Sequence, residues 1–264
     1  MSLFSLSTWA LALFLFGIVI AATVGGNLFG RSLRSRSKGQ REPFGVLQAA
    51  MLGFMALVLA FGLSLAVGRY ENRRAAVVDE ANALGTAYLR AQTIAEPERT
   101  PSLDLLRQLT DVSVDIAETV PGSPEQLDAI TRGGKVQSAL WDRAGQAVSA
   151  APTATAPRLY LDSLNTAFDA QSTRIYGLGN RVPTPVLLLE IIGAAIALGL
   201  LALHLGALGR GPVIAMLAAL LVGSTLYITF DLDRPVRGLI NVPADPLTNL
   251  RVSMDNPPAY SGPS

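Results

Sequence analysis

The chain carries too few metal-binding or nucleophilic side chains to suggest an enzyme. It has 264 residues with no cysteine and a single histidine, His204. Thiolate metal sites, disulfides and cysteine catalysis are therefore excluded, and a histidine-based metal site or a Ser-His-Asp triad is not expected. No phosphate-binding loop, nucleophile elbow or dinucleotide fingerprint occurs either. The sequence predicts a protein that is not an enzyme and that needs no cofactor or metal.

The residues that could act on ions are charged or polar side chains beside, or inside, apolar segments. At helical spacing Arg69, Arg73 and Glu80 share one helix face. Such a group forms either a charged vestibule that concentrates ions or a ring of interfacial ion pairs. Both interpretations stay open. The full candidate set is Arg69, Arg73, Glu80, Asn82, Glu190, Asp231, Asp233, Arg234 and Arg237, and a second stripe consists of Asp79, Thr86 and Arg90.

Glu190 is the one acidic residue inside a long apolar segment. Carboxylates within membrane spans usually face a bundle interior or a water path and mark function. Glu190 also lies five residues after Pro185, so its side chain could instead extend to the membrane surface. His204 ends the same segment beside Gly206 and is expected at the interface.

The composition points to a membrane. Half of the residues are hydrophobic, 16% are charged, and the mean hydropathy is +0.39. Four stretches are long enough to cross a bilayer, which takes about 20 residues. They cover about 9–29, 44–68, 185–205 and 212–230. The sequence predicts an all-α integral membrane protein with four transmembrane helices in two hairpins and an inserted helical domain. Its net charge of +1 gives no reason to expect nucleic acid as a partner.

The predicted organisation has four parts. Residues 1–68 contain the first transmembrane hairpin, and residues 183–231 contain the second. The residues between them, 69–182, form the helical extramembrane domain. Residues 232–264 form a juxtamembrane segment and a disordered tail, because the chain ends in a run rich in proline, serine and glycine.

The inserted domain shows helical periodicity and no alternating strand pattern. The second span is expected to continue into it as one helix. Thr100 and Pro101 look like the N-cap and first residue of the next helix. A third helix is expected from Ser123, with an interruption at Gly133-Gly134. A linker at 149–157 precedes the fourth.

Orientation follows from basic residues in the short loops. The basic residues near the spans are nearly balanced, six on the side of the loops and seven on the side of the domain. The first loop carries a dense group of them immediately after the first span, which favours loops in the cytoplasm and a helical domain in the periplasm of a bacterial inner membrane. These residues are Arg31, Arg34, Arg36, Lys38 and Arg41.

Small residues recur at every fourth position of three spans. Such faces allow close helix packing and self-association. The three sets are Gly17, Ala21 and Gly25; Ala56, Ala60, Ser64 and Gly68; and Ala215, Ala219 and Gly223. We therefore expect a homo-oligomer in the lipid bilayer.

Several stretches resemble one bacterial membrane-protein family, the bestrophin-like family. They are RYENRR at 69–74, the segment 78–90, NRVP at 180–183 and DLDRPVRGLI at 231–240. The resemblance implies distant similarity to anion channels, with two hairpins flanking a helical region that continues the second span. In bestrophins that region is cytoplasmic, which conflicts with the orientation inferred from charge. The second span also lacks the tight aromatic cluster of a bestrophin pore neck.

Two functions are compatible with these features. The chain could be an oligomeric bestrophin-like ion channel, selective for anions by the resemblance, with inorganic ions as its partners. Alternatively, it could be a non-conducting sensor or scaffold that binds partners through its helical domain. Three of the four spans contain no charged residue, yet hydrophobic constrictions gate some channels.

Single cysteines test the orientation, because the chain has none of its own. We expect Ser35→Cys and Ser138→Cys to react with a membrane-impermeant maleimide from opposite sides of the membrane. Ser138→Cys should be labelled from the periplasm and Ser35→Cys from the cytoplasm. Labelling of Ser35→Cys from the periplasm alone would contradict this orientation.

Overall fold

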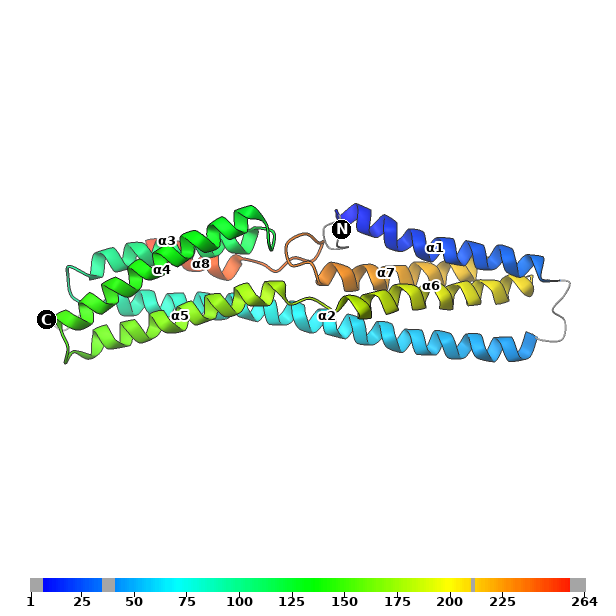
Figure 1. The fold of residues 1–264 in the computed structure, drawn as a ribbon, viewed down its shortest axis with the longest axis horizontal. Coiled ribbons are helices and arrows are strands. Elements are labelled where there is room, and N and C mark those ends of the chain that lie inside the picture. Colours follow the sequence, from blue (N-terminus) through cyan, green and yellow to red (C-terminus); the bar gives the residue numbers. More distant parts are fainter. Residues whose placement is uncertain (1–6, 35–40, 210–211, 257–264) are drawn as a thin grey trace. The chain divides into compact units, whose positions relative to one another are not determined.

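A computed structural model describes residues 7–34, 41–209 and 212–256. The described residues form helices and no strands, which confirms the all-α prediction (Figure 1). The elements are α1 (Thr8–Ser32), α2 (Arg41–Ala91), α3 (Arg99–Glu118), α4 (Pro124–Ala150), α5 (Thr155–Gly179), α6 (Thr184–Ala207), α7 (Val213–Leu232) and α8 (Asp245–Asp255).

The chain divides into two compact units. The first, the span unit, contains residues 1–70 and 181–241; the second, the helical unit, contains residues 71–180 and 242–264. Helix α2 supplies residues to both. Among the described residues, four helical stretches are long and apolar enough to cross a membrane. They are Thr8–Ser32, Phe44–Ala91, Thr155–Ala207 and Val213–Leu232, and each of them overlaps one of the predicted spans.

In the span unit, α1 packs directly against α6 and α7 (Figure 1). The backbones of α1 and α6 touch, because glycines occupy the contact. A Cβ atom at Gly26 would overlap the carbonyl oxygen of Gly199, and one at Gly30 would overlap that of Leu203. Close backbone approach through small residues is how helices associate in lipid, where the hydrophobic effect does not drive them together.

The small-residue face predicted on the first span is not the packed face. Nothing lies within 4 Å of a Cβ atom built at Gly17 or Gly25. The contact with α6 uses Gly26 and Gly30 instead. These two glycines belong to a four-residue pattern that is shifted by one residue from the predicted stripe. An apolar segment rich in alanine and glycine contains several four-residue patterns, and the neighbouring helix selects which one packs within the subunit. The expectation of self-association through the exposed face stays a prediction.

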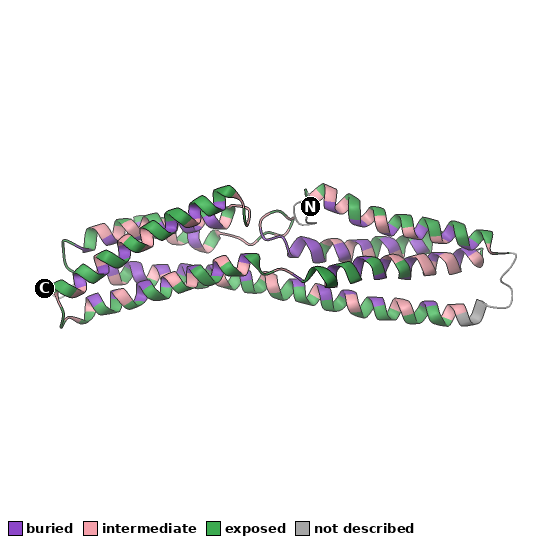
Figure 2. Ribbon diagram, in the orientation of Figure 1, coloured by how far each residue is buried: buried purple, intermediate pink, exposed green. Residues whose placement is uncertain are grey.

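Along α2, buried residues recur every three or four positions, which is the spacing of one helix face (Figure 2). This buried stripe is apolar in the span unit and includes charged residues in the helical unit. Its members are Met55, Leu59, Gly62 and Ala66 in the first, and Arg73, Val77, Glu80 and Leu84 in the second.

Each helix of the helical unit contributes to its main hydrophobic core, and a smaller cluster of residues from α3, α4 and α5 lies apart from it. Leu84, Leu106, Leu140, Leu164 and Leu247 are all fully buried in the main core. The leucines come from α2, α3, α4, α5 and α8 in turn, so the core joins segments that are far apart in the chain.

Three local details differ from the predictions. Helix α4 runs without a break through Gly133 and Gly134, and the linker before α5 is shorter than 149–157 because α5 begins at Thr155. Thr100 is not an N-cap, because α3 already begins at Arg99. The Glu96 carboxylate accepts hydrogen bonds from the Thr100 hydroxyl at 2.7 Å and backbone N–H at 3.3 Å, which lowers the pKa of Glu96.

The C-terminal segment contains a helix that was not predicted. Residues 245–255, assigned to the juxtamembrane segment and tail, form α8, which packs on α3. Leu247 and Met254 are buried in the core. Tyr88 and Arg107 both donate hydrogen bonds to the carbonyl oxygen of Met254, at 2.9 and 3.1 Å, so one of the carbonyl groups at the C-terminal end of α8 is satisfied. The rest of the predicted tail, 257–264, lies outside the described residues.

The glycine contact between α1 and α6 gives a testable prediction. We expect Gly26→Ala to lower the free energy of unfolding by about 1–3 kcal/mol, because the added methyl group pushes the two backbones apart. Gly25→Ala is the matched control, since its methyl group meets open space. Thermal and denaturant unfolding of the detergent-solubilised protein measures both. Equal effects of the two changes would refute the packing described here.

Candidate functional site

Glu80 lies at the centre of a buried polar cluster in the helical unit. Its side chain is fully buried and forms an ion pair with Arg174, which is 2% exposed. Ser113 donates a hydrogen bond to Glu80 Oε1 at 2.6 Å, and Gln171 Nε2 donates to the same oxygen at 3.2 Å. Arg174 Nη2 also donates to the Ser113 carbonyl oxygen at 3.0 Å. These groups satisfy one another inside the unit, so Glu80 does not face a water-filled path.

Arg73 has a similar role at the end of α5. It is 4% exposed, and its Nη2 atom donates to the carbonyl oxygen of Asn180 at 2.7 Å. Its Nε atom donates to the carbonyl oxygen of Gly177 at 3.4 Å. The last carbonyl groups of a helix have no partner within the helix and attract a positive charge. Arg73 therefore holds the C-terminal end of α5 against α2.

Asp231 organises the segment that follows α7. The side chain is fully buried, and its two oxygens accept hydrogen bonds from the backbone N–H groups of Leu239 at 3.1 Å and Ile240 at 2.9 Å. A Cβ atom at Gly238 would lie 2.6 Å from Asp231 Oδ1, so a side chain there would displace the carboxylate. The Asp231 carboxylate thus stabilises a turn that brings residues 239 and 240 back to the end of α7.

The neighbouring residues Asp233 and Arg237 form hydrogen bonds with other segments of the span unit. Asp233 Oδ2 accepts a hydrogen bond from the backbone N–H of Val182, just before α6, at 3.0 Å. The backbone oxygen of Arg237 accepts one from the Thr8 hydroxyl at 2.7 Å. Arg234 is 3% exposed and Arg69 is half-buried, whereas the Arg237 side chain is exposed.

Glu190 is buried inside the span unit. Its side chain is 0% exposed, so the predicted alternative, in which it extends to the membrane surface, is wrong. Neither carboxylate oxygen has a hydrogen-bond partner in the described part of the chain. His204, at the other end of α6, is half-buried and stacks on Phe44 with ring centroids 5.8 Å apart.

Asn82, by contrast, is exposed and lines an open polar groove of about 340 Å³ between α2 and α5. Asp79, Thr86 and Arg90 of the second predicted stripe line the same groove, opposite Asp162 of α5. Arg90 Nη1 lies 3.5 Å from the Asp162 carboxylate. Within the residues that the structure describes, no three acidic or histidine side chains gather as a metal site.

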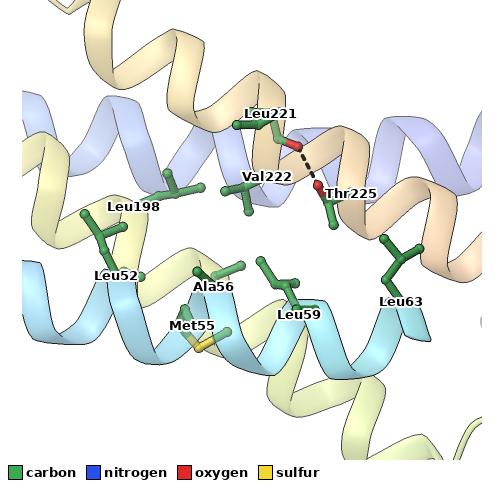
Figure 3. Close-up of a pocket in the computed structure, with 12 residues that line it drawn as sticks. Leu52, Met55, Ala56, Leu59, Leu63, Leu198, Leu221, Val222 and Thr225 are labelled. Carbon is green, nitrogen blue, oxygen red and sulfur yellow. Dashed lines mark hydrogen bonds between the residues drawn. The ribbon is translucent and has the colours of Figure 1, made fainter. Parts of the chain in front are cut away.

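A second groove, in the span unit, is apolar and measures about 450 Å³. Figure 3 shows it between Leu52, Ala56 and Leu59 of α2 and Val222 and Thr225 of α7. The Thr225 hydroxyl donates to the Leu221 carbonyl oxygen at 3.0 Å, so the groove offers no free polar group from that residue.

Comparison with known proteins identifies the family. The model of the bestrophin-like domain matches residues 12–247, which is most of the chain. The chain belongs to the bestrophin-like family. This confirms the resemblance seen in the sequence. Together with the four apolar helices, it identifies a membrane protein.

Solved structures of a bacterial bestrophin homologue from Klebsiella pneumoniae share the fold of this bestrophin-like chain. A variant of that homologue has a TM-score of 0.70 at 13% identity, covering 92% of this chain and 97% of the other. A further structure of it, phased with zinc, has a TM-score of 0.68 at 14% identity, covering 90% and 97%. No curated protein sequence matches the chain.

The partners of Glu80 were not among the candidates from sequence, although a signal existed. Ser113 lies four residues after Leu109 and three before Ile116, on a mainly apolar helix face. Arg174 likewise lies on the buried face of α5. A polar residue in an apolar stripe indicates a buried hydrogen bond, because an unpaired polar group would destabilise the core.

The buried ion pair of this bestrophin-like protein gives a prediction. We expect Arg174→Met to lower the free energy of unfolding by about 3–5 kcal/mol, because it leaves the Glu80 charge buried without its counter-ion. Arg132→Met is the matched control, since Arg132 pairs with Asp115 and Asp128 on the surface and should matter little. Denaturant unfolding followed by circular dichroism measures both. A mild effect at Arg174 would mean that the pair is not desolvated as described.

Proposed function

We propose that this chain assembles with copies of itself into an ion channel of the bacterial inner membrane. Four spans in two hairpins would anchor it, with the helical domain inserted between them. Membership of the bestrophin-like family and the fold of a bacterial bestrophin homologue support this proposal.

The observation that carries the proposal is a stripe of α2 that the other described residues leave exposed. It lies opposite the buried stripe and recurs at the same three- and four-residue spacing. The stripe is apolar up to Phe61, and from Ser64 onward it consists of small or polar residues. This open stripe consists of Leu57, Phe61, Ser64, Gly68, Asn72, Ala75, Asp79, Asn82 and Thr86, all exposed.

In a ring of identical subunits the open stripe would line the pore. Leu57 and Phe61 would form the hydrophobic constriction, and Asn72, Asn82 and Thr86 would provide polar contacts for ions. Of the predicted candidates, Asn82 alone lies on the open stripe. Arg73 and Glu80 are used in contacts within the subunit.

Asp79 is the one charged residue of the open stripe. A ring of carboxylates in a pore attracts cations and repels anions. The arginines that would favour anions lie elsewhere. We therefore expect the channel to pass potassium better than chloride, in contrast to the anion preference that the bestrophin resemblance implies.

Flux through the purified protein in liposomes tests this proposal. We expect potassium efflux to exceed chloride efflux, and Asp79→Asn to reduce that preference severalfold. Asp162→Asn is the matched control, because Asp162 lies in the same polar groove but on α5. Its potassium-to-chloride ratio should equal that of the unaltered protein.

Three outcomes would count against parts of the proposal. A preference for chloride that Asp79→Asn leaves unchanged would remove the open stripe as the ion path. A monomer in native mass spectrometry would remove the ring. Silent liposomes containing verified oligomers would favour the alternative, a non-conducting scaffold. The contacts of Arg73 and Glu80 within the subunit suit that alternative equally well.

A further inference from the structure

Glu190 has no role in the proposed channel, yet its surroundings are unusual. The carboxyl group is fully buried, and neither oxygen has a hydrogen-bond partner in the described residues. Burying an ionised carboxylate without a partner is very unfavourable, so such a group persists in an apolar interior as the neutral acid. Acidic residues are accordingly rare within membrane spans.

No charge on the helices around α6 compensates Glu190. Between Thr8 and Gly30 α1 contains no titratable residue, and α2 contains none between Phe44 and Gly68. In the apolar part of α7, Val213 to Phe230, the one titratable residue is Tyr227. On α6 itself, His204 lies 14 residues further on, about 21 Å along the helix.

Along the chain, the first charged residues beyond these apolar stretches lie where the neighbouring helices end. Arg69 follows the apolar part of α2, seven residues or about 10 Å beyond Gly62. Asp231 is at the end of α7, where it accepts from two backbone N–H groups and from Tyr227. Asp233 accepts from Val182, and Arg234 lies beside them. The Asp231 carboxylate is thus engaged by the segment after α7, and the Asp233 carboxylate by the residues just before α6.

Glu190 is also the point where α6 meets α2. Its carboxyl group lies against Gly62, and a Cβ atom at Gly62 would overlap Glu190 Oε1. One turn further along α6, Gly193 faces Met55, whose Cε atom would be 2.7 Å from a Cβ atom there. Two glycines, one on each helix, therefore let α2 and α6 approach. There is no room at Gly62 for the water that an ionised carboxylate would require.

We propose that Glu190 is a proton-binding site within the membrane, and that its bound proton holds α2 against α6. Loss of the proton creates a charge that the closed contact at Gly62 does not solvate. The ionised form is therefore stable only when α2 moves away and water enters. This proposal concerns the packing of a single subunit and does not depend on ion conduction.

The apolar groove of Figure 3 gives access to this site from the bilayer. Leu59 and Leu63 of α2, which flank Gly62, line the groove, and so does Ala194, one turn after Glu190 on α6. A small apolar molecule dissolved in the membrane can therefore come within about one helical turn of the carboxyl group.

Carbodiimide labelling tests the proposal directly. Dicyclohexylcarbodiimide partitions into membranes and reacts with carboxyl groups that carry a proton. We expect it to modify Glu190 of the full-length protein in liposomes, as read by peptide mass spectrometry. Labelling should decrease as the pH rises from about 5 to about 9. Glu190→Gln should lose the modification, whereas Glu118→Gln, which alters an exposed carboxylate, should retain it.

Thermal unfolding as a function of pH provides the second measurement. The folded state favours the protonated acid, so raising the pH should lower the Tm of the unaltered protein relative to Glu190→Gln. The two should converge at low pH, where the side chain is neutral in both the folded and unfolded states. Glu118→Gln should follow the unaltered protein throughout.

The two measurements together decide the matter. Labelling of Glu190 with a pH-dependent difference in Tm supports the proton site. If Glu190 stays unlabelled at every pH and the Glu190→Gln curve runs parallel to that of the unaltered protein, the proposal is overturned. Either result stands whether or not the liposomes conduct ions, so it is separate from the channel proposal.

Discussion

Helix α2 imposes the constraint on which both units depend. A helix that packs on its neighbours buries one stripe at a spacing of 3.6 residues, whatever side chains fall there. On α2 the stripe begins with Met55 and Leu59 and reaches Arg73 and Glu80 further along. The apolar part needs only close packing. The charged part requires partners, since unpaired charges cannot be buried.

The helical unit supplies those partners from two other helices. Ser113 comes from α3, while Gln171 and Arg174 come from α5 and enclose the Glu80 carboxylate. Arg73 reaches the last carbonyl groups of α5. Charges that could have lined an ion path instead join helices. Polar character remains on the uncovered side of α2, where Asn82 is exposed.

The span unit solves a different problem, because lipid is as apolar as the helices themselves. Association there depends on close contact between backbones, which Gly26 and Gly30 of α1 allow. A buried carboxylate is unfavourable in such surroundings unless it has hydrogen-bond partners. The Asp231 carboxylate has them, because it accepts hydrogen bonds from two backbone N–H groups of a turn. Glu190 has none of these partners, and a bound proton is the simplest species that makes its burial possible.

Some of this structure follows from the sequence alone. The four apolar helices could be predicted, because the hydropathy and length of a local stretch of sequence decide whether it can span a bilayer. The helical character of the inserted domain could also be predicted, because periodicity is local. The resemblance carried by residues 231–240 correctly indicated the bestrophin-like family.

The remaining features were decided by tertiary contacts. Gly26 rather than Gly25 contacts α6, because the orientation of the neighbouring helix selects among similar small-residue patterns. Helix α8 is ordered because Leu247 and Met254 complete a core built from distant segments. Glu80 is a structural residue rather than an exposed one because Arg174, 94 residues later, lies beside it. Pairings between residues so far apart depend on how the helices pack, which spacing along one helix does not encode.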